Sequence, residues 1–312
     1  MGTSEFAVAS LDAIVQAGHE VAAVVTVPDK PAGRGQQLRF SDVKNYALEH
    51  QLAVLQPEKL KDPAFVEELR RLNADVFVVV AFRMLPEIVY AMPPKGTFNI
   101  HASLLPQYRG AAPINWAVIN GEKETGVTSF FLNREIDKGD IIAQTKLAIG
   151  DEESAGELHD RLMVEGAALA VKTLDMIAAD KVTLLPQPQT DDAQLKPAPK
   201  IFREDMLIDW NQPARIIHDK IRGLSPYPAA YTRIQDLKGE VYTIKCFQTA
   251  ILPEKSTSEP GTITIDSRKK LIVSTQDVQI QVQNIQFQGK KRMNSEFFLP
   301  GFHFENYIAK FF

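Results

Sequence analysis

The sequence Ala-Asp-Val-Phe-Val-Val-Val-Ala at residues 74–81 is apolar at every position except Asp75. Such a continuous apolar run is typical of a strand that is covered on both faces of its sheet. Similar strand-like patterns occur at residues 21–27, 96–101 and 127–132. These four runs therefore predict the strands of one buried sheet.

Helical patterns lie between and after these runs, at residues 65–72, 85–91, 113–120 and 154–179. The longest begins with Ser154 and Glu157, which have the spacing of a capping box. Alternation of strands and helices predicts an α/β fold with a Rossmann-like, doubly wound and mostly parallel sheet. Such sheets bind their ligands beyond the carboxyl ends of the strands.

The pattern changes at residues 183–200, which contain four prolines and little hydrophobic periodicity. We interpret this segment as an extended linker. After it, a helix is predicted at residues 213–223, and short strands follow at residues 240–247, 261–266, 270–275 and 278–287. Closely spaced strands predict a small, OB-like β-barrel. We therefore expect a domain at 1–182, a linker at 183–200 and a C-terminal domain at 201–312.

The composition is that of an ordinary globular protein. The chain has 312 residues, of which 45% are hydrophobic and 24% charged, and it has one cysteine, Cys246. That length indicates two domains, and a lone cysteine suits a reducing compartment. No apolar run approaches the roughly 20 residues needed to cross a bilayer. We therefore expect a cytoplasmic protein without membrane contact, and the scattered histidines predict no metal site.

Charge is distributed unevenly along the chain. Residues 201–312 hold 15 Lys and Arg against 12 Asp and Glu, while residues 1–200 hold 20 against 27. The C-terminal part is therefore mildly basic and the rest acidic. A polyanionic partner would be attracted to the basic part.

Two polar side chains stand close together in the predicted strand at 96–101. Asn99 and His101 are two residues apart, so they project from the same face near the carboxyl end of the strand. An amide donor beside an imidazole can polarise a carbonyl group and stabilise an oxyanion. The pair alone is better explained by two polar groups that are satisfied locally at a strand end.

A second polar stretch, Ile-Asp-Lys-Gly-Asp-Ile-Ile, occupies residues 136–142 before another strand. One of its carboxylates could orient a histidine and increase its basicity. Taken alone, the stretch also fits an ordinary Asp/Gly turn.

In combination, these motifs resemble the folate-dependent formyltransferase family. The resemblance is carried by Asn-x-His at 99–101, Ser-Leu-Leu-Pro at 103–106, Arg-Gly-Ala-Ala-Pro at 109–113 and Asp-x-Gly-Asp-Ile at 137–141. Three further stretches narrow it to the members that formylate methionyl-tRNA. These are residues 1–8, the loop Pro-Asp-Lys-Pro-Ala-Gly-Arg-Gly at 28–35, and Gln-Gly-Lys-Lys-Arg-Met at 288–293.

The resemblance implies a role for each matched residue. It implies that Asn99, His101 and Asp137 are catalytic, and that the segment from Ser103 through Leu104 and Leu105 to Pro106 binds the folate. It also implies 10-formyltetrahydrofolate as formyl donor and initiator methionyl-tRNA as acceptor. We expect tRNA contacts from four basic residues, namely Arg34, Lys290, Lys291 and Arg292.

The sequence departs from the family pattern in two places. Arg83 stands where the family often has glycine, which affects the expected shape of the folate pocket. The chain also begins at the Gly-Thr turn that usually follows a first apolar strand. A sheet that lacks this strand would leave backbone groups unpaired, so we expect an apolar strand upstream of Met1 in the native product.

Two alternatives to this function remain. Other formyl-folate transferases, which act on a sugar nucleotide or on glycinamide ribonucleotide, share the three catalytic residues. The loop at 28–35 and the basic C-terminal part favour tRNA over those acceptors. A non-catalytic RNA-binding protein would explain the charge distribution, but it would leave Asn99, His101 and Asp137 without a role.

Overall fold

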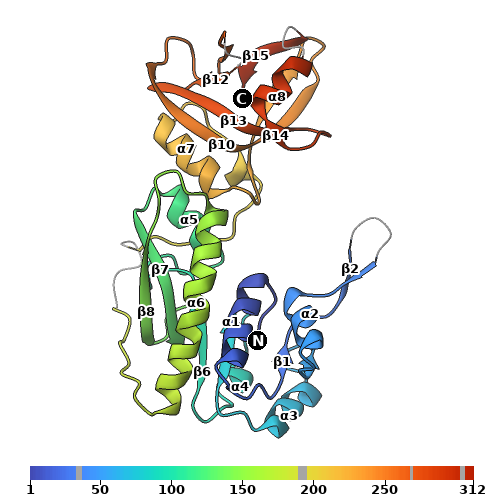
Figure 1. Cartoon of the computed structure of the whole chain (residues 1–312), viewed down its shortest axis with the longest axis vertical. Helices are drawn as coiled ribbons and strands as arrows, with labels where there is room; N and C mark the ends of the chain where they lie inside the picture. Colours follow the sequence, from blue (N-terminus) through green and yellow to red (C-terminus); the bar gives the residue numbers. More distant parts are fainter. Residues whose placement is uncertain (33–36, 189–194, 268–269, 303–305) are drawn as a thin grey trace. The chain divides into compact units, whose positions relative to one another are not determined.

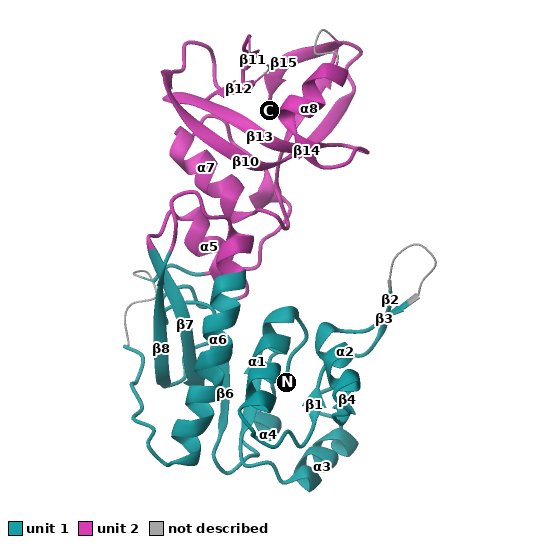
Figure 2. Cartoon of the chain, in the orientation of Figure 1, with its two compact units in different colours: residues 1–110, 124–148, 160–197 teal, residues 111–123, 149–159, 198–312 magenta. Residues whose placement is uncertain are grey.

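A computed structural model of the protein describes residues 1–32, 37–188, 195–267, 270–302 and 306–312 (Figure 1). The chain forms two compact units, each assembled from separate segments (Figure 2). The first consists of residues 1–110, 124–148 and 160–197, and the second of residues 111–123, 149–159 and 198–312. Our division at residues 182 and 201 remains a proposal; the units differ from it because segments 111–123 and 149–159 group with the C-terminal part.

The elements of the first unit alternate as the sequence pattern indicates. In chain order they are α1 (Glu5–Gln16), β1 (Val24–Val25), β2 (Lys30–Ala32), β3 (Gln37–Arg39), α2 (Asp42–Glu49), β4 (Val54–Leu55), α3 (Pro63–Leu72), β5 (Phe77–Val80), α4 (Glu87–Tyr90), β6 (Thr97–His101), β7 (Glu124–Phe131) and β8 (Ile141–Ala148). Helix α3 shows how local sequence sets the bounds. Asp62 accepts a hydrogen bond from the backbone N of Ala64 before the first turn, and Asn73 ends the helix in a left-handed conformation.

The long helix α6 (Ala155–Ala178) contributes residues to both units. Its predicted capping box is confirmed. The Ser154 backbone N–H donates to Glu157 Oε2 at 2.8 Å, and the Glu157 N–H donates to Ser154 Oγ at 3.3 Å. Within the part of the chain that the structure describes, no helix is both long and apolar enough to span a membrane.

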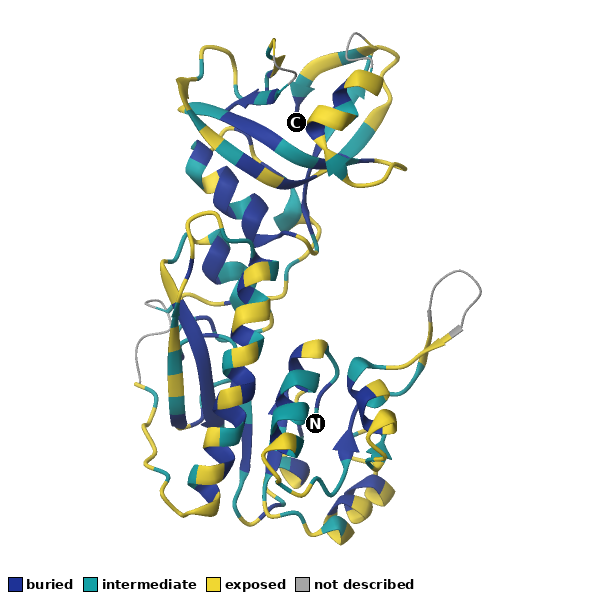
Figure 3. Ribbon diagram, in the orientation of Figure 1, coloured by how far each residue is buried: buried dark blue, intermediate teal, exposed yellow. Residues whose placement is uncertain are grey.

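The sheet of the first unit is mixed. Strand β1 pairs with β4 and β5 pairs with β6 in parallel, whereas β7 and β8 run antiparallel to their neighbours. Met1 and Gly2 connect the two parallel pairs: the Gly2 N–H donates to Val25 O, and the Val80 N–H donates to Met1 O, both at 3.0 Å. Strands β5 and β6 and most of β7 are buried (Figure 3). The predicted α/β class is confirmed.

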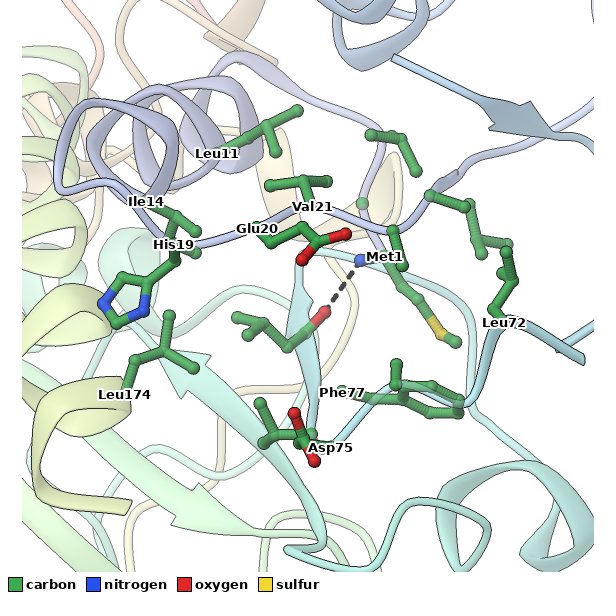
Figure 4. A pocket seen from close by; sticks show the side chains of 18 of the residues that line it. Met1, Leu11, Ile14, His19, Glu20, Val21, Leu72, Asp75, Phe77 and Leu174 are labelled. Atoms are coloured by element: carbon green, nitrogen blue, oxygen red, sulfur yellow. Dashed lines mark hydrogen bonds between the residues drawn. The ribbon is translucent and has the colours of Figure 1, made fainter. Parts of the chain in front are cut away.

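A cavity of about 520 Å³ lies beside Met1 in the first unit (Figure 4). Its walls are mainly apolar and include residues 20–25 and 74–78. The Met1 backbone nitrogen donates a hydrogen bond to Val78 O at 2.7 Å. Strand β1 covers only part of the predicted run at 21–27, since only Val24 and Val25 pair with β4.

The second unit contains a nearly closed antiparallel barrel, as predicted. Its strands follow the order β11-β12-β13-β10-β9-β15, with β14 on β13, and the Thr262–Lys310 bridge brings the two ends together. The inward side chains, such as Ile234, Ile244 and Val282, are fully buried. The strands are β9 (Ala230–Asp236), β10 (Val241–Lys255), β11 (Ile263–Ile265), β12 (Leu271–Ser274), β13 (Val278–Phe287), β14 (Met293–Asn294) and β15 (Tyr307–Phe311).

Helices complete the second unit. They are α5 (Pro113–Ile119), the 3₁₀ helix η2 (Glu204–Met206), α7 (Ala214–Gly223), α8 (Ser295–Phe298) and the 3₁₀ helix η3 (Leu299–Gly301). Helix α7 packs against α5 at Gly223, where a Cβ atom would lie 2.8 Å from the backbone N of Ile119. The carbonyl of Gly223 accepts a 2.7 Å hydrogen bond from the Asn115 amide, which fixes this close helix contact.

Candidate active site

Strand β6 presents Asn99 and His101 side by side, as the sequence predicts. It lies between β5 and β7, with Asn99 opposite Val79 on one side and Phe130 on the other. The side chains of Phe98 and Ile100 are buried on the other face of the strand. This packing fixes the direction in which the amide and the imidazole project.

His101 is buried and is held through one ring nitrogen. Its Nε2 lies 2.8 Å from the carbonyl oxygen of Tyr108, and its Nδ1 lies 3.9 Å from Asp137 Oδ2. The edge of Phe130 meets the ring at a centroid distance of 6.5 Å. His101 and Asp137 are 36 residues apart in the sequence, and the fold brings them together in one small site.

Asp137 occupies the turn between β7 and β8 in the left-handed conformation, with φ of 53°. Its Oδ2 accepts a 2.9 Å hydrogen bond from the backbone N–H of Gly110. The following Gly139 cannot carry a side chain, because a Cβ atom there would lie 1.6 Å from the carbonyl oxygen of Phe131. The glycine of the Asp-x-Gly motif thus allows the turn to close against β7.

Asn99 differs from its neighbours in this site. It is half-buried, and its side-chain amide makes no hydrogen bond to any residue that the structure describes. An amide next to a histidine that is not engaged by protein groups remains available to donate to a bound molecule.

The segment from Ser103 to Pro106 forms a fixed loop directly after β6. Thr128 Oγ1 donates to Ser103 O at 2.6 Å and accepts from the Leu105 N–H at 3.2 Å. Gln144 Nε2 donates to Leu105 O at 3.0 Å, and the Leu105–Pro106 peptide is cis. The loop's shape is thus set by side chains of β7 and β8.

The other predicted contacts lie elsewhere or cannot be placed. Arg34 lies outside the described residues. Lys290, Lys291 and Arg292 are exposed in the second unit, after β13. Arg83 donates to the carbonyl oxygens of Pro57 at 2.8 Å and Glu58 at 3.0 Å, and so fastens its own loop to the one before α3.

The sequence did not indicate several groups that hold the candidate catalytic residues and the 103–106 loop in place. The Tyr108 carbonyl and the Gly110 N–H act through the backbone, so their side chains give no indication of the role. Thr128 and Gln144 lie on strands whose pairing the hydrophobic pattern does not specify. Across the described ranges no three His, Cys, Asp or Glu side chains are grouped so that they could hold a metal ion.

Comparison with known proteins identifies the family. The formyl transferase model matches residues 1–174, and the model of the formyl transferase C-terminal domain matches residues 200–303. The methionyl-tRNA formyltransferase of Bacteroides fragilis is 52% identical, and that of Azobacteroides pseudotrichonymphae 53%. These alignments cover 97% and 96% of this chain, and 94% of each relative.

Among solved structures, the sugar 3N-formyl transferase WlaRD has a similar fold. Its TM-score is 0.63 at 20% identity, over 93% of this chain and 97% of that one. At this identity the likeness concerns the fold alone. Two matched domain models and relatives more than 50% identical over nearly the whole length show that the chain belongs to the formyl transferase family.

Proposed function

We propose that the protein transfers the formyl group of 10-formyltetrahydrofolate to the amino group of methionine on initiator methionyl-tRNA. The observation that carries the proposal is the grouping of Asn99, His101 and Asp137 at the end of β6. The relatives at 52% and 53% identity are methionyl-tRNA formyltransferases, which favours this acceptor. The WlaRD structure was obtained in the presence of 5-N-formyl-THF, which favours a formyl-folate donor.

The reaction forms one carbon–nitrogen bond and breaks another. The methionine amine attacks the formyl carbon, and the formyl oxygen carries negative charge until the bond to the folate N10 breaks. The amine loses a proton and N10 gains one, giving formylmethionyl-tRNA and tetrahydrofolate. Catalysis therefore requires a hydrogen-bond donor for the oxygen and groups that can move a proton.

The site residues suit these two tasks. The free amide of Asn99 can donate to the developing oxyanion. His101 donates Nε2–H to the Tyr108 carbonyl, so that Nδ1 is the nitrogen that exchanges a proton. A proton on Nδ1 lies near the carboxylate of Asp137, which orients the ring and can help to take the amine proton. No covalent enzyme intermediate is required.

The remaining parts of the proposal concern binding and location. We assign the segment from Ser103 to Pro106 to the folate, and Arg34, Lys290, Lys291 and Arg292 to the tRNA. Loss of Arg34 should lower kcat/KM for methionyl-tRNA without a change in folate affinity. Arg34→Lys should recover only part of the loss, since lysine keeps the charge but not the planar fork of donors. We place the reaction in the cytoplasm.

A direct assay tests the proposed function. The protein is incubated with 10-formyltetrahydrofolate and initiator tRNA charged with labelled methionine, and the amino acid released by base is then identified. We expect formylmethionine. Parallel reactions offer an amino-sugar nucleotide or glycinamide ribonucleotide as acceptor. Formylation of either of these, with free methionine recovered from the tRNA, would replace the proposed acceptor.

A further inference from the structure

The segment that follows α6 runs along the edge of the first unit's sheet, although its prolines indicate only a linker. Leu185 and Ile141 form an antiparallel bridge in which each backbone N–H donates to the other's carbonyl oxygen at 2.9 Å. In an antiparallel pair, two residues forward on one side correspond to two residues back on the other. Gln187 therefore comes opposite Gly139.

Gln187 is half-buried, while the preceding residues 183–186 are exposed. Its Nε2 donates to the carbonyl oxygen of Asp137 at 2.9 Å and to that of Gly139 at 2.8 Å. Its Oε1 accepts from Arg109 twice, from Nε at 3.2 Å and from an Nη at 2.6 Å. All four hydrogen bonds thus go to the two loops that form the candidate active site.

The direction of the amide follows from its partners. The Asp137 and Gly139 carbonyls can only accept, so the NH₂ group must face them. The Arg109 guanidinium can only donate, so the amide oxygen must face it. Glutamine suits this position because its terminal amide carries two N–H donors on Nε2 and an acceptor, Oε1, on the same carbon.

These bonds complete a closed ring of contacts around Asp137. The side chain of Arg109 binds Gln187, and Gln187 binds the backbone on both sides of Lys138. Next to Arg109, the Gly110 N–H donates to the Asp137 carboxylate. Asp137 has a positive φ, which aspartate tolerates better than most residues with a side chain, so the contacts on both sides of the turn decide where its carboxylate points.

We propose that Gln187 is a positioning residue for formyl transfer: it holds the backbone of the 137–139 turn so that the Asp137 carboxylate faces His101. The inference rests on the proposed function for its kinetic part. A competing explanation is that Gln187 only anchors Arg109. The two explanations differ in which end of the amide is needed.

Two substitutions separate them. Gln187→Met keeps the length and removes both polar functions. Gln187→Glu keeps an acceptor for Arg109 but places an oxygen, instead of a donor, against the carbonyls of Asp137 and Gly139. If Gln187 positions Asp137, both variants should lower kcat by about 10- to 100-fold with KM for both substrates nearly unchanged. Gln16→Met is the matched control, because Gln16 is exposed on α1, and it should behave as wild type.

Coupling to Asp137 provides a second readout. In an Asp137→Asn background, Gln187→Met should lower kcat by less than about threefold, because its effect acts through a carboxylate that is already gone. Full additivity of the two substitutions would overturn the proposal. Wild-type kcat in Gln187→Glu would also overturn it, and would assign Gln187 to Arg109 alone. If Gln187→Met fails to fold, the kcat of Gln187→Glu alone distinguishes the two explanations.

A third measurement does not depend on activity. The Gly110 N–H is protected by Asp137, so its hydrogen exchange in the intact chain should become about tenfold faster in Gln187→Glu than in wild type. Unchanged exchange would overturn the positioning role, whatever the enzyme formylates. The two proposals can fail separately. If the wild-type protein does not formylate methionyl-tRNA, the proposed function is overturned. If exchange is still faster in Gln187→Glu, the positioning role stays in place.

Discussion

At the scale of single residues, the contact of His101 with Tyr108 defines the tautomer of the neutral ring. The Tyr108 carbonyl can only accept, so Nε2 carries the hydrogen and the neutral ring has its lone pair on Nδ1. The 3.9 Å between Nδ1 and Asp137 Oδ2 exceeds a hydrogen bond, so the two groups interact mainly when the ring is protonated. The site can therefore hold one mobile proton between a substrate amine and this pair.

Removal of His101 or Asn99 tests these roles. Asn99→Ala should lower kcat by about 10²- to 10³-fold, the usual effect of losing one oxyanion donor. His101→Ala should lower it by about 10²- to 10⁴-fold, the usual effect of losing a group that moves a proton. Neither substitution should change tRNA binding much. Rates at saturating substrate and tRNA affinity by filter binding give the two quantities. His50→Ala is the control, because the ring nitrogen of His50 also lies 2.9 Å from a backbone carbonyl. Near-normal turnover of His101→Ala would exclude the assigned role.

Gly139 offers a test of the turn itself. A methyl group there would lie 1.6 Å from the Phe131 carbonyl oxygen, and neither backbone can yield without disturbing Asp137. Gly139→Ala should therefore cost about 1–3 kcal/mol of unfolding free energy or more and abolish most activity. Urea denaturation measures the loss. Gly301→Ala should be nearly neutral, because among the described residues no atom apart from its chain neighbours lies within 4 Å of the added methyl group. Equal stability of both variants would contradict this account of the turn.

At the scale of elements, the sequence predicts what depends on local pattern. The strand at 96–101, the cap at Ser154 and the barrel strands are confirmed, because apolar periodicity and capping act over a few residues. The antiparallel direction of β7 and β8 depends on pairing between distant segments. The role of Gln187 depends on the register of a proline-rich segment against residue 139, which no pattern within residues 183–200 encodes.

Helix α7 carries a group of buried charges that no motif indicates. The Asp219 carboxylate accepts from Arg215 at 2.8 Å and from Arg222 at 2.6 Å. His218 is 2% exposed, and its Nδ1 lies 3.0 Å from Thr249 Oγ1 on β10. Burial lowers the pKa of His218; the charges of Glu152 and Asp219 oppose this shift, and those of Arg215 and Arg222 add to it.

This shift predicts a pH dependence of stability. At pH values below the ordinary histidine pKa of about 6.5, the unfolded chain binds a proton at His218 more readily than the folded chain does. The free energy of unfolding should thus be highest above that pH and fall as the pH drops below it. His218→Gln should flatten this part of the profile. Urea titrations from pH 5 to 8 measure both curves, and His50→Gln is the control. Identical slopes in wild type and His218→Gln would show that His218 is not responsible.

At the scale of the whole molecule, charge is divided between the part that holds the candidate catalytic residues and the C-terminal part. The candidate catalytic residues belong to the first unit, and residues 1–200 carry a net charge of −7. Residues 201–312 carry +3 and include the turn after β13 with Lys290 and Lys291. The backbone of that turn is fixed, since the Lys290 N–H donates to Phe287 O at 2.9 Å and Gln286 Nε2 donates to Lys290 O at 3.0 Å.

A fixed and exposed cationic turn should bind phosphates, and salt dependence measures this. Each neutralised phosphate adds about 0.7–0.9 to the slope of log K against log salt. Replacing Lys290, Lys291 and Arg292 by alanine should weaken tRNA binding and reduce that slope by up to about 2–3, leaving folate affinity unchanged. Arg292 also covers the Phe247 ring at 4.1 Å and donates to Asn284, so its loss affects packing as well.

The variant Lys290→Ala/Lys291→Ala avoids that complication and should reduce the slope by up to about 2, because each lysine neutralises at most one phosphate. A matched control replaces exposed lysines of the first unit, Lys59 and Lys61, by alanine. The control removes the same charge from the protein, so a general effect of net charge would lower both slopes equally. A smaller slope in the Lys290/Lys291 variant alone assigns these lysines to the tRNA. Equal slopes in both variants would mean that the turn after β13 is an ordinary solvated surface and that the tRNA is held elsewhere.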